Sequence, residues 1–508
     1  MGSQLLSNLV TNLISLALSV LTSIWMTPFI VRRLGAEAFG YIPLTNNLVS
    51  FLTVLTIVLS SVIGRFVLVS VKQGSYEDAQ GYINTFFYSS LVFSGILCIP
   101  LTLATIFIDR IINVPKYLLF DVRMSLIISG LLLLISFINS LFATAPFSAN
   151  RLDISNGINV IGVIIRTIVI ITFLTLLLPR IWYVSLASLI SGLATLLIGI
   201  YFFRKLMPWA KLNKTFFHRK KLYELLASGS WSAINHLGVV LFLQVDLIVA
   251  NLVIGSEAAG RYAAVMQFPT LIRAIAGNVA AVFAPVIITL YAQKNMKKLV
   301  AYSNRAVKLN GLILALPLGL LCVMSEALLR VWLGPQFENL KWLLVLMSFH
   351  LIINLFVMPL FHIPTAVNKL RTPALMTLTL GVVNLVLAFL LSGPFKMGLY
   401  GIALAGAISL TIKNFIFTPI YSAYITKQPP YIYYKGVLGP VLSTTIIIIT
   451  GLAIQWFLPI TNWLILVTDS MIISFIYCIL VFQFLINKEE KQRVRDIFNS
   501  FKYQINKN

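Results

Sequence analysis

The sequence has little charge and almost no cysteine. Only 10% of its 508 residues are Asp, Glu, Lys or Arg, whereas 59% are apolar and the mean hydropathy is +0.94. One soluble core cannot hide that much apolar surface, so the composition excludes an ordinary soluble protein and predicts an integral membrane protein. The three cysteines, Cys98, Cys322 and Cys478, lie in apolar runs without CxxC or Cys/His spacing. This pattern indicates neither a disulfide framework nor a metal site.

The motifs of catalysis and nucleotide hydrolysis are missing as well. The sequence has no Walker A stretch, no zinc signature and no convincing grouping of nucleophile, His and acid. We therefore expect a protein that is not an enzyme and that uses no cofactor and no metal. If it transports a solute, the energy has to come from an ion gradient or from the concentration difference of the solute.

Positive charge outweighs negative charge, with 38 Lys and Arg against 15 Asp and Glu and a net charge of +23. The cations lie in short loops between apolar runs, so we expect no nucleic acid as a partner. If the N-terminus is cytoplasmic, the cytoplasmic loops and the C-terminal tail hold 25 of the 38 cations and the opposite side holds 10. This asymmetry predicts a multi-pass protein with both termini in the cytoplasm.

The apolar runs predict an all-α membrane protein with fourteen spans, because each run has the roughly 20 residues that cross the hydrocarbon. We expect a first lobe of six helices, a basic cytoplasmic linker, a second lobe of six helices, two trailing helices and a basic cytoplasmic tail, at 1–203, 204–226, 227–425, 426–487 and 488–508. Within the linker, 204–221 mixes cations with Trp209, Phe216 and Phe217. That mixture suits a lipid-surface segment, and an ordinary retained loop between the lobes is the favoured interpretation.

Three local matches recur in order at nearly one offset. The matched positions are 35–40 with 255–260 and 110 with 330, both at an offset of 220, and 146–152 with 364–370, at 218. Matches in the same order indicate a duplicated unit of six spans. Since six is even, both copies enter the membrane from the same side, as parallel repeats about an axis along the membrane normal. Two such lobes enclose a site near the midplane and expose it to either side by rocking.

Three cations fall near the middle of predicted spans. They are Arg166, Arg273 and Lys413, in spans 154–179, 260–291 and 398–425. Each costs about 2.5 to 3.5 kcal/mol in lipid unless it faces a wet interior or a partner. Two interpretations stay open. The cations line a cavity that attracts phosphate, or they serve structure, with Arg273 paired to Asp246 and Lys413 snorkelling along its stem.

Other polar residues also have two interpretations. Arg65, at the inner end of span 40–64, suits an interfacial anchor or a ligand. Asn46 and Gln267 belong to a set of Asn and Gln in spans one, two, seven and eight. Their amides suit a lining for sugar hydroxyls or polar contacts between helices.

Four stretches spread over most of the chain carry a family resemblance. They are TPFIVRRLGAEAFGYIPL at 27–44, DLIVANLVIGSEAAGRYAAVMQF at 246–268, LLRVWLGPQFENLKWLL at 328–344 and KMGLYGIALAGAISL at 396–410. Each is a loose apolar pattern, but their order and spacing over two lobes and two trailing helices are specific. By these stretches the chain resembles the polysaccharide flippases of the multidrug/oligosaccharidyl-lipid/polysaccharide (MOP) exporter superfamily.

The resemblance implies a MATE-like inverted V of two lobes around a cationic cavity. The implied activity is the passage of undecaprenyl-diphosphate-linked oligosaccharide repeat units, of capsule or O-antigen type, from the inner to the outer leaflet of a bacterial cytoplasmic membrane. Lipid-linked oligosaccharide, membrane lipids and polysaccharide assembly proteins are the implied partners. Similar flippases have cavity cations in spans eight and twelve, at the positions of Arg273 and Lys413. We add Arg166, Arg65 and Asp246 to the predicted substrate-binding residues because of their predicted positions in the membrane spans.

Two other functions stay open. A cation-coupled drug exporter of the same fold would use acids in its first lobe, and the predicted spans one to six contain no Asp or Glu. A membrane polysaccharide polymerase or acyltransferase would need a large outer loop or clustered His and acid groups, and the predicted outer loops are short.

Overall fold

The computed structural model describes residues 2–457 and 460–485, and within these ranges every regular element is helical. Fourteen of these helical segments are long and apolar enough to cross a membrane. A helix satisfies its backbone N–H and C=O groups internally, as a segment without access to water requires. The prediction of an all-α multi-pass membrane protein with fourteen spans is confirmed. The predicted tail at 488–508 lies outside the described residues.

The chain forms two compact units, each made from two stretches of sequence. Unit 1 comprises the residues up to Gln267 together with Leu370–Ser409, and unit 2 comprises Phe268–Lys369 together with the residues from Leu410 onward. The division into two lobes of six helices, with its boundaries at 203 and 227, stays a prediction.

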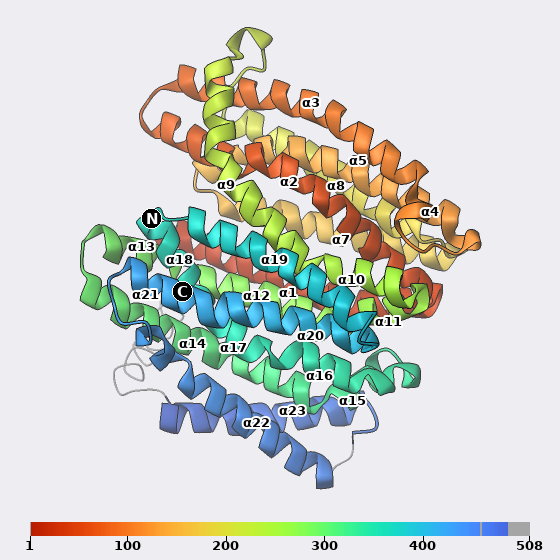
Figure 1. Ribbon diagram of the computed structural model, residues 1–508. Helices are drawn as coiled ribbons and strands as arrows, with labels where there is room; N and C mark the ends of the chain where they lie inside the picture. Colours follow the sequence, from red (N-terminus) through yellow and green to blue (C-terminus); the bar gives the residue numbers. More distant parts are fainter. Residues whose placement is uncertain (1, 458–459, 486–508) are drawn as a thin grey trace, which may run out of the picture. The chain divides into compact units, whose positions relative to one another are not determined.

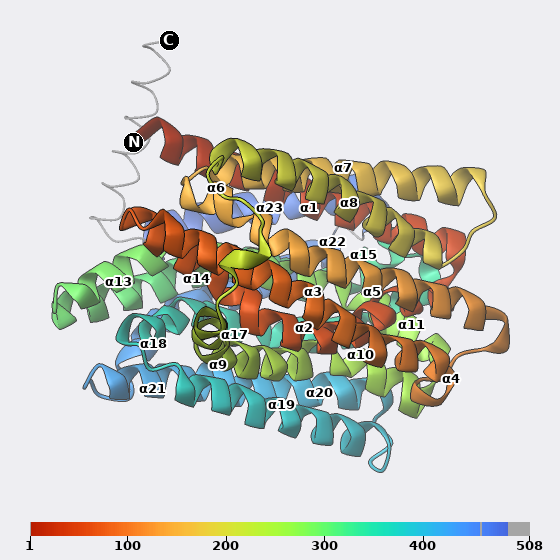
Figure 2. The ribbon, with the colours of Figure 1, turned by 90° about the horizontal axis from the view of Figure 1, so that it is seen from above.

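Unit 1 is built around the long helix α2, against which α3, α5 and α9 pack (Figures 1 and 2). Helices α7 and α8 lie side by side, with α1 against α7 and α19 against α9. The helices of unit 1 are α1 (Gly2–Leu34), α2 (Ala36–Lys72), α3 (Tyr76–Ile106), α4 (Ile108–Ile111), α5 (Leu119–Phe142), α6 (Thr144–Ser148), α7 (Leu152–Leu176), α8 (Trp182–Leu206), α9 (Arg219–Leu243), α10 (Val245–Val249), α11 (Ser256–Val265), α19 (Arg371–Ser392) and α20 (Gly398–Leu410), with the short turns η1 (Lys116–Leu118), η2 (Lys214–Phe216) and η3 (Ala250–Ile254).

Unit 2 has α14 at its centre, in contact with α16, α17 and α22. Leu314, Leu318 and Phe356 are fully buried in its apolar core. The helices of unit 2 are α12 (Gln267–Ala281), α13 (Ala284–Ala292), α14 (Met296–Val323), α15 (Ser325–Trp332), α16 (Lys341–Phe349), α17 (Leu351–Phe356), α18 (His362–Val367), α21 (Thr418–Ile425), α22 (Leu438–Phe457) and α23 (Trp463–Leu480), with the short helical segments η4 (Pro335–Leu340), η5 (Met358–Phe361), η6 (Thr411–Phe417), η7 (Ile432–Gly436) and η8 (Val481–Leu485).

The sequence repeat has a counterpart in the backbone. Gly35 and Gly255 precede α2 and α11 with φ of 85° and 127°, values that glycine adopts without strain. Asn150 and Asn368 are both left-handed, with φ of 54° and 58°. In both copies the residue after the asparagine donates its N–H to the carbonyl five residues before it, at 2.8 and 2.9 Å. This hydrogen bond is typical of the Schellman motif at the end of a helix. Equal local structures at matched positions support the duplication.

The two copies of the glycine turn meet inside unit 1. A Cβ atom on Gly40 would lie 2.5 Å from the Cα of Gly260, and a Cβ atom on Gly260 would lie 2.1 Å from the carbonyl oxygen of Ala36. Both distances are far below van der Waals contact, and the opposing atoms belong to backbone that cannot rotate away. Glycine at both positions is therefore what lets the first turns of α2 and α11 touch.

Hydrogen bonds reinforce this corner. The Glu37 carboxylate accepts the hydroxyl of Tyr117 at 2.6 Å and the hydroxyl of Ser256. Beside it, the Asn113 N–H donates to Oδ1 of Asn251 at 2.8 Å, and the Asn251 amide donates to the Asn113 carbonyl at 3.1 Å. The glutamate of the first copy thus joins the two copies of the turn, which is a structural role.

We predict that Gly260→Ala destabilises the protein by on the order of 1–3 kcal/mol, because the added methyl group overpacks a backbone contact. Thermal unfolding of the purified protein in detergent measures the loss. Gly95→Ala in α3 is the matched control, since nothing lies within 4 Å of its Cβ position. Equal melting temperatures for Gly260→Ala and the control would show that the corner is not closely packed.

Candidate substrate-binding site

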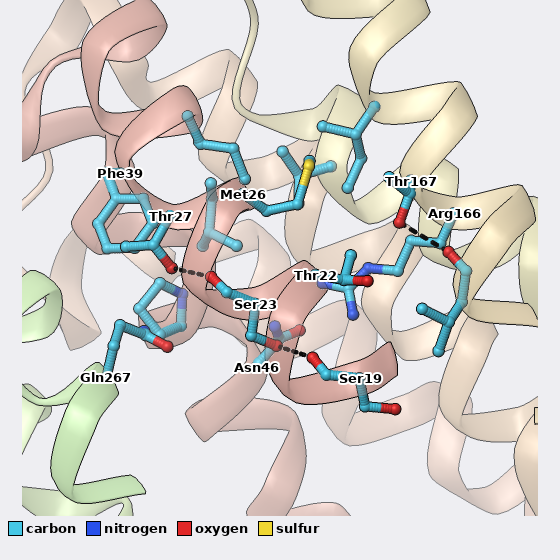
Figure 3. A pocket seen from close by; sticks show the side chains of 16 residues that line it. Ser19, Thr22, Ser23, Met26, Thr27, Phe39, Asn46, Arg166, Thr167 and Gln267 are labelled. Atoms are coloured by element: carbon cyan, nitrogen blue, oxygen red, sulfur yellow. Dashed lines mark hydrogen bonds between the residues drawn. The ribbon is translucent and has the colours of Figure 1, made fainter. Parts of the chain in front are cut away.

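A polar cavity of about 390 Å³ lies within unit 1, where α1, α2, α7 and α8 come together (Figure 3). Half of its lining side chains carry a hydroxyl, amide or guanidinium group. The lining residues are Ser19, Thr22, Ser23, Met26, Thr27, Ile30, Phe39, Ile42, Pro43, Asn46, Val163, Arg166, Thr167, Ile170, Val184 and Gln267. So polar a lining, inside helices that are otherwise apolar, is typical of a site for a water-soluble group.

One wall of the cavity is a row of hydroxyls on α1. Ser19, Thr22, Ser23 and Thr27 are spaced by three, one and four residues, which places them on one face of the helix. Each hydroxyl donates to the carbonyl four residues earlier, at distances from 2.6 to 3.0 Å. A hydroxyl whose hydrogen is used in this way still has its oxygen lone pairs. This wall therefore offers hydrogen-bond acceptors to whatever enters the cavity.

Arg166 supplies the positive charge of the cavity. It lies near the middle of α7, and Val163 and Ile170 on the same face line the cavity with it. Its side chain is exposed to the cavity, and Figure 3 shows it extending from α7 toward Thr22 of α1. Within residues 2–457 and 460–485, no acid or hydrogen-bond partner engages its guanidinium. A cation at this depth without a protein partner has to be solvated by water or by a bound anion.

Two amides complete the polar lining. Oδ1 of Asn46 accepts the hydroxyl of Ser129 at 3.2 Å, so the amide hydrogens are what this side chain can offer a ligand. Nε2 of Gln267 donates to the carbonyl of Ala263 at 3.4 Å, a long bond that leaves Oε1 as an acceptor. Both residues are among the polar positions singled out in the sequence.

Acidic groups stay out of the cavity lining in the described part of the chain. The helices extend beyond the predicted spans, so α7 includes Asp153, which pairs with Arg151 at 2.9 Å, and α5 includes Asp121 in its first turn. There the buried Asp121 carboxylate accepts from the guanidinium of Arg180 and from the N–H of Ile181, both at 3.1 Å. Asp121 and Asp153 are thus each paired with an arginine away from the cavity lining, and the charge of the cavity remains positive.

The other two predicted residues of unit 1 have different surroundings. Arg65 in α2 is exposed, with its guanidinium 5.3 Å from the ring centre of Phe66, and it is not among the cavity residues. Asp246 in α10 accepts from the amide of Asn384 and from the hydroxyl of Tyr262, each at 3.3 Å. The roles predicted for Arg65 and Asp246 in substrate binding stay predictions.

Arg273 and Lys413 belong to unit 2. Arg273 lies in α12 and is half-buried. Lys413 lies in η6, a π-helical segment of the twelfth span, with its ammonium group 4.7 Å from the ring centre of Phe361. π-Helical turns occur frequently at functional sites. The substrate-binding roles of Arg273 and Lys413 also stay predictions.

The hydroxyls of α1, together with Thr167 of α7, are functional candidates that the sequence analysis did not identify. Their signal is present in the sequence as hydroxyls on one face of an apolar run. Because Ser and Thr are common in membrane helices, such a row becomes specific only when a cation is found opposite it. Among the described residues, no group of three or more His, Cys, Asp or Glu side chains is placed to hold a metal ion.

One family model matches more than half of this chain, and a curated relative matches nearly all of it. The family described as "Polysaccharide biosynthesis protein" matches residues 4–291. A protein of Bacillus subtilis (strain 168), named "Uncharacterized membrane protein EpsK", is 42% identical over 499 residues, which is 98% of this chain and 99% of that protein.

Solved structures share the fold at low sequence identity. An inward-facing multidrug resistance MATE family transporter of the MOP superfamily has a TM-score of 0.66 at 15% identity, over 81% of this chain and 96% of its own. Lipid II flippase MurJ, in an inward closed conformation, has a TM-score of 0.65 at 15% identity, over 94% and 99%. A MOP superfamily transporter from Pyrococcus furiosus has a TM-score of 0.63 at 15% identity, over 84% and 96%. These likenesses confirm the predicted MOP-type fold.

Arg166 and Arg180 have different surroundings, so we expect their replacement by leucine to affect the stability of the protein differently. Arg166→Leu removes a cation without a protein partner, so we expect the free energy of unfolding to stay within about 0.5 kcal/mol of the wild type or to rise. Arg180→Leu strips the buried Asp121 carboxylate of its cation, and we expect a loss of about 1–3 kcal/mol. Thermal unfolding of both variants in one detergent compares them. A large loss for Arg166→Leu would mean that the guanidinium holds the fold together.

Proposed function

The chain belongs to the family of polysaccharide biosynthesis proteins, and we propose that it carries lipid-linked polysaccharide precursors across a bacterial cytoplasmic membrane. The proposed cargo is an undecaprenyl-diphosphate-linked oligosaccharide repeat unit, of the kind used for capsule or O-antigen, which passes from the inner to the outer leaflet. Both termini are cytoplasmic in this proposal. The protein then acts as a transporter and catalyses no covalent step.

The observation that carries this proposal is the polar cavity around Arg166. A sugar hydroxyl that enters hydrocarbon without a hydrogen-bond partner costs roughly 2–7 kcal/mol, and a diphosphate costs far more. The cargo therefore needs a path lined by polar groups and cations, while its prenyl tail can remain in lipid. The hydroxyls of α1 and the guanidinium of Arg166 provide such groups in the middle of membrane-spanning helices.

In the proposed mechanism, two repeated lobes expose a cationic site alternately to the two sides of the membrane. Arg166, Arg273 and Lys413 attract the diphosphate, and arginine can engage it with two parallel hydrogen bonds. Arg65, close to the cytoplasmic end of α2, assists entry of the anion. Asp246 acts through its bonds to Asn384 and Tyr262, which order the helices beside the site.

The alternatives have less support. A cation-coupled drug exporter has the same fold, but a positively charged cavity without a lining acid repels a cationic drug and offers no carboxylate to titrate. A polysaccharide polymerase or acyltransferase needs a reactive centre. The cavity residues include no Cys, His, Asp or Glu for that purpose.

Reconstituted vesicles test the proposal. We expect the wild-type protein to speed the movement of a labelled lipid-linked oligosaccharide between leaflets, and to show neither drug efflux nor polymerase activity in parallel assays. Arg273→Ala and Lys413→Ala should each slow this movement by about tenfold, because each removes a charged contact to the cargo. In cells the same variants should reduce surface polysaccharide while their membrane insertion is unchanged.

Arg110→Ala is the matched control, because Arg110 is exposed on the short helix α4 and lies over the ring of Phe107. Normal transport and normal glycan display in both single variants and in the double variant would remove Arg273 and Lys413 from the site. Drug efflux by the wild type, without movement of the oligosaccharide, would replace the proposed function with the exporter.

A further inference from the structure

We propose that residues 211–220, which lead from the connection after α8 into the first turn of α9, form a binding surface for the headgroups of anionic phospholipids. This segment, KLNKTFFHRK, is called the basic loop below. In the proposed topology it lies at the cytoplasmic end of unit 1, beside the inner leaflet. The proposal goes beyond the proposed function, because it concerns lipids that stay in the membrane and are not carried across it.

The first observation is a concentrated positive charge. The basic loop contains no Asp or Glu, and its four exposed cations are Lys211, Lys214, Arg219 and Lys220. Across the ranges 2–457 and 460–485, none of these four forms an ion pair with an acid. Asp78 of α3 is already bonded to Lys221, at 2.8 Å. Cations that the protein leaves without acids attract the negatively charged surface of a cytoplasmic leaflet.

The second observation is that the backbone of the basic loop is fixed on α3. The buried Asn84 donates its amide N–H to the carbonyl of Lys211 at 2.8 Å, and its Oδ1 accepts the N–H of Asn213 at 2.7 Å. The buried Thr85 hydroxyl accepts the N–H of His218 at 3.1 Å. The turn η2 thus lies against α3 (Figures 1 and 2). A loop that is ordered in advance loses less conformational entropy when a headgroup binds to it.

The third observation concerns apolar side chains beside the cations. Met207 and Trp209, which precede the basic loop, pack with the apolar core of unit 1. Leu212 in the loop and Tyr223 in α9 stay outside, with 41% and 77% of their surfaces exposed. Cations together with exposed apolar and tyrosine side chains, at the ends of membrane spans, are typical of a segment at headgroup level. This combination favours a phospholipid over an acidic protein as the partner.

Native mass spectrometry of the purified full-length protein tests the proposal. The probes are phosphatidylglycerol and phosphatidylcholine, added in detergent at equal concentrations. We expect the wild type to retain phosphatidylglycerol in preference. A variant with Lys211→Gln, Lys214→Gln, Arg219→Gln and Lys220→Gln should bind phosphatidylglycerol at least about tenfold more weakly, because each cation near an anionic headgroup adds to the attraction. Its affinity for phosphatidylcholine should not change.

Two further variants distinguish a defined surface from net charge. Replacement of the exposed Lys294, Lys297 and Lys298 by glutamine removes three cations from another predicted cytoplasmic loop, and the affinity for phosphatidylglycerol should stay within about twofold of the wild type. Asn84→Ala keeps every cation but removes the two bonds that hold the basic loop, so we expect the affinity to fall by about threefold. Thr85→Val, which removes the bond to His218, is measured beside it, and melting temperatures show that both variants are folded.

Several results would overturn the proposal. They are wild-type affinity for phosphatidylglycerol in the variant with four glutamines, an equal loss in the Lys294 variant, and unchanged affinity in both folded variants of α3. Preference for undecaprenyl phosphate over phosphatidylglycerol would make the basic loop a site for the cargo. Loss of a co-purifying acidic protein, with lipid binding unchanged, would assign the loop to that protein. Lipid binding as expected, without movement of oligosaccharide in vesicles, would remove the proposed function and leave this surface.

Discussion

A guanidinium in the middle of a membrane-spanning helix has to be kept away from acyl chains, and this constraint governs the arrangement around Arg166. Among the described residues no acid neutralises it, and α1 faces it with hydroxyls instead of leucines. Contact with lipid would cost about 2.5 to 3.5 kcal/mol, whereas a wet cavity avoids most of that cost. A protein selected for stability alone would place an apolar residue here. The position therefore reflects a need for a positive charge at depth.

The doubled glycine turn forms a closely packed contact in unit 1, between the first turns of α2 and α11. This contact is far from Arg166 along the chain. Gly40 and Gly260 let backbone touch backbone, and Glu37 of the first copy accepts the hydroxyl of Ser256 of the second. One duplicated motif has thus produced two surfaces that fit each other. The contact lies at the first turn of α2, and α2 is also one of the helices that line the cavity.

The sequence predicted the helical class, the fourteen spans and the matched positions of the repeat, because hydropathy, length and local motifs are properties of neighbouring residues. It also identified Arg166, Asn46 and Gln267 as polar groups at depth. It did not reveal the hydroxyl wall, since Ser19 and Thr22 gain meaning only from Arg166 on a helix more than a hundred residues away. The contact of Gly40 with Gly260 is likewise non-local. The buried cations are more than 100 positions apart along the chain, so the sequence does not show which of them share one unit. The roles of Arg65, Asp246, Arg273 and Lys413 stay predictions.

Water has to reach Arg166 inside the membrane if the cavity is wet, and labelling of an introduced thiol measures this directly. The three native cysteines are replaced by alanine, and Arg166→Cys is compared in lipid vesicles with Ile168→Cys, an exposed apolar position on another face of α7. A thiol reacts as its thiolate, which forms in water and not in hydrocarbon. The account predicts that a charged, membrane-impermeant thiol reagent modifies the Arg166→Cys variant and spares Ile168→Cys. Equal protection of both positions would contradict a water-filled cavity.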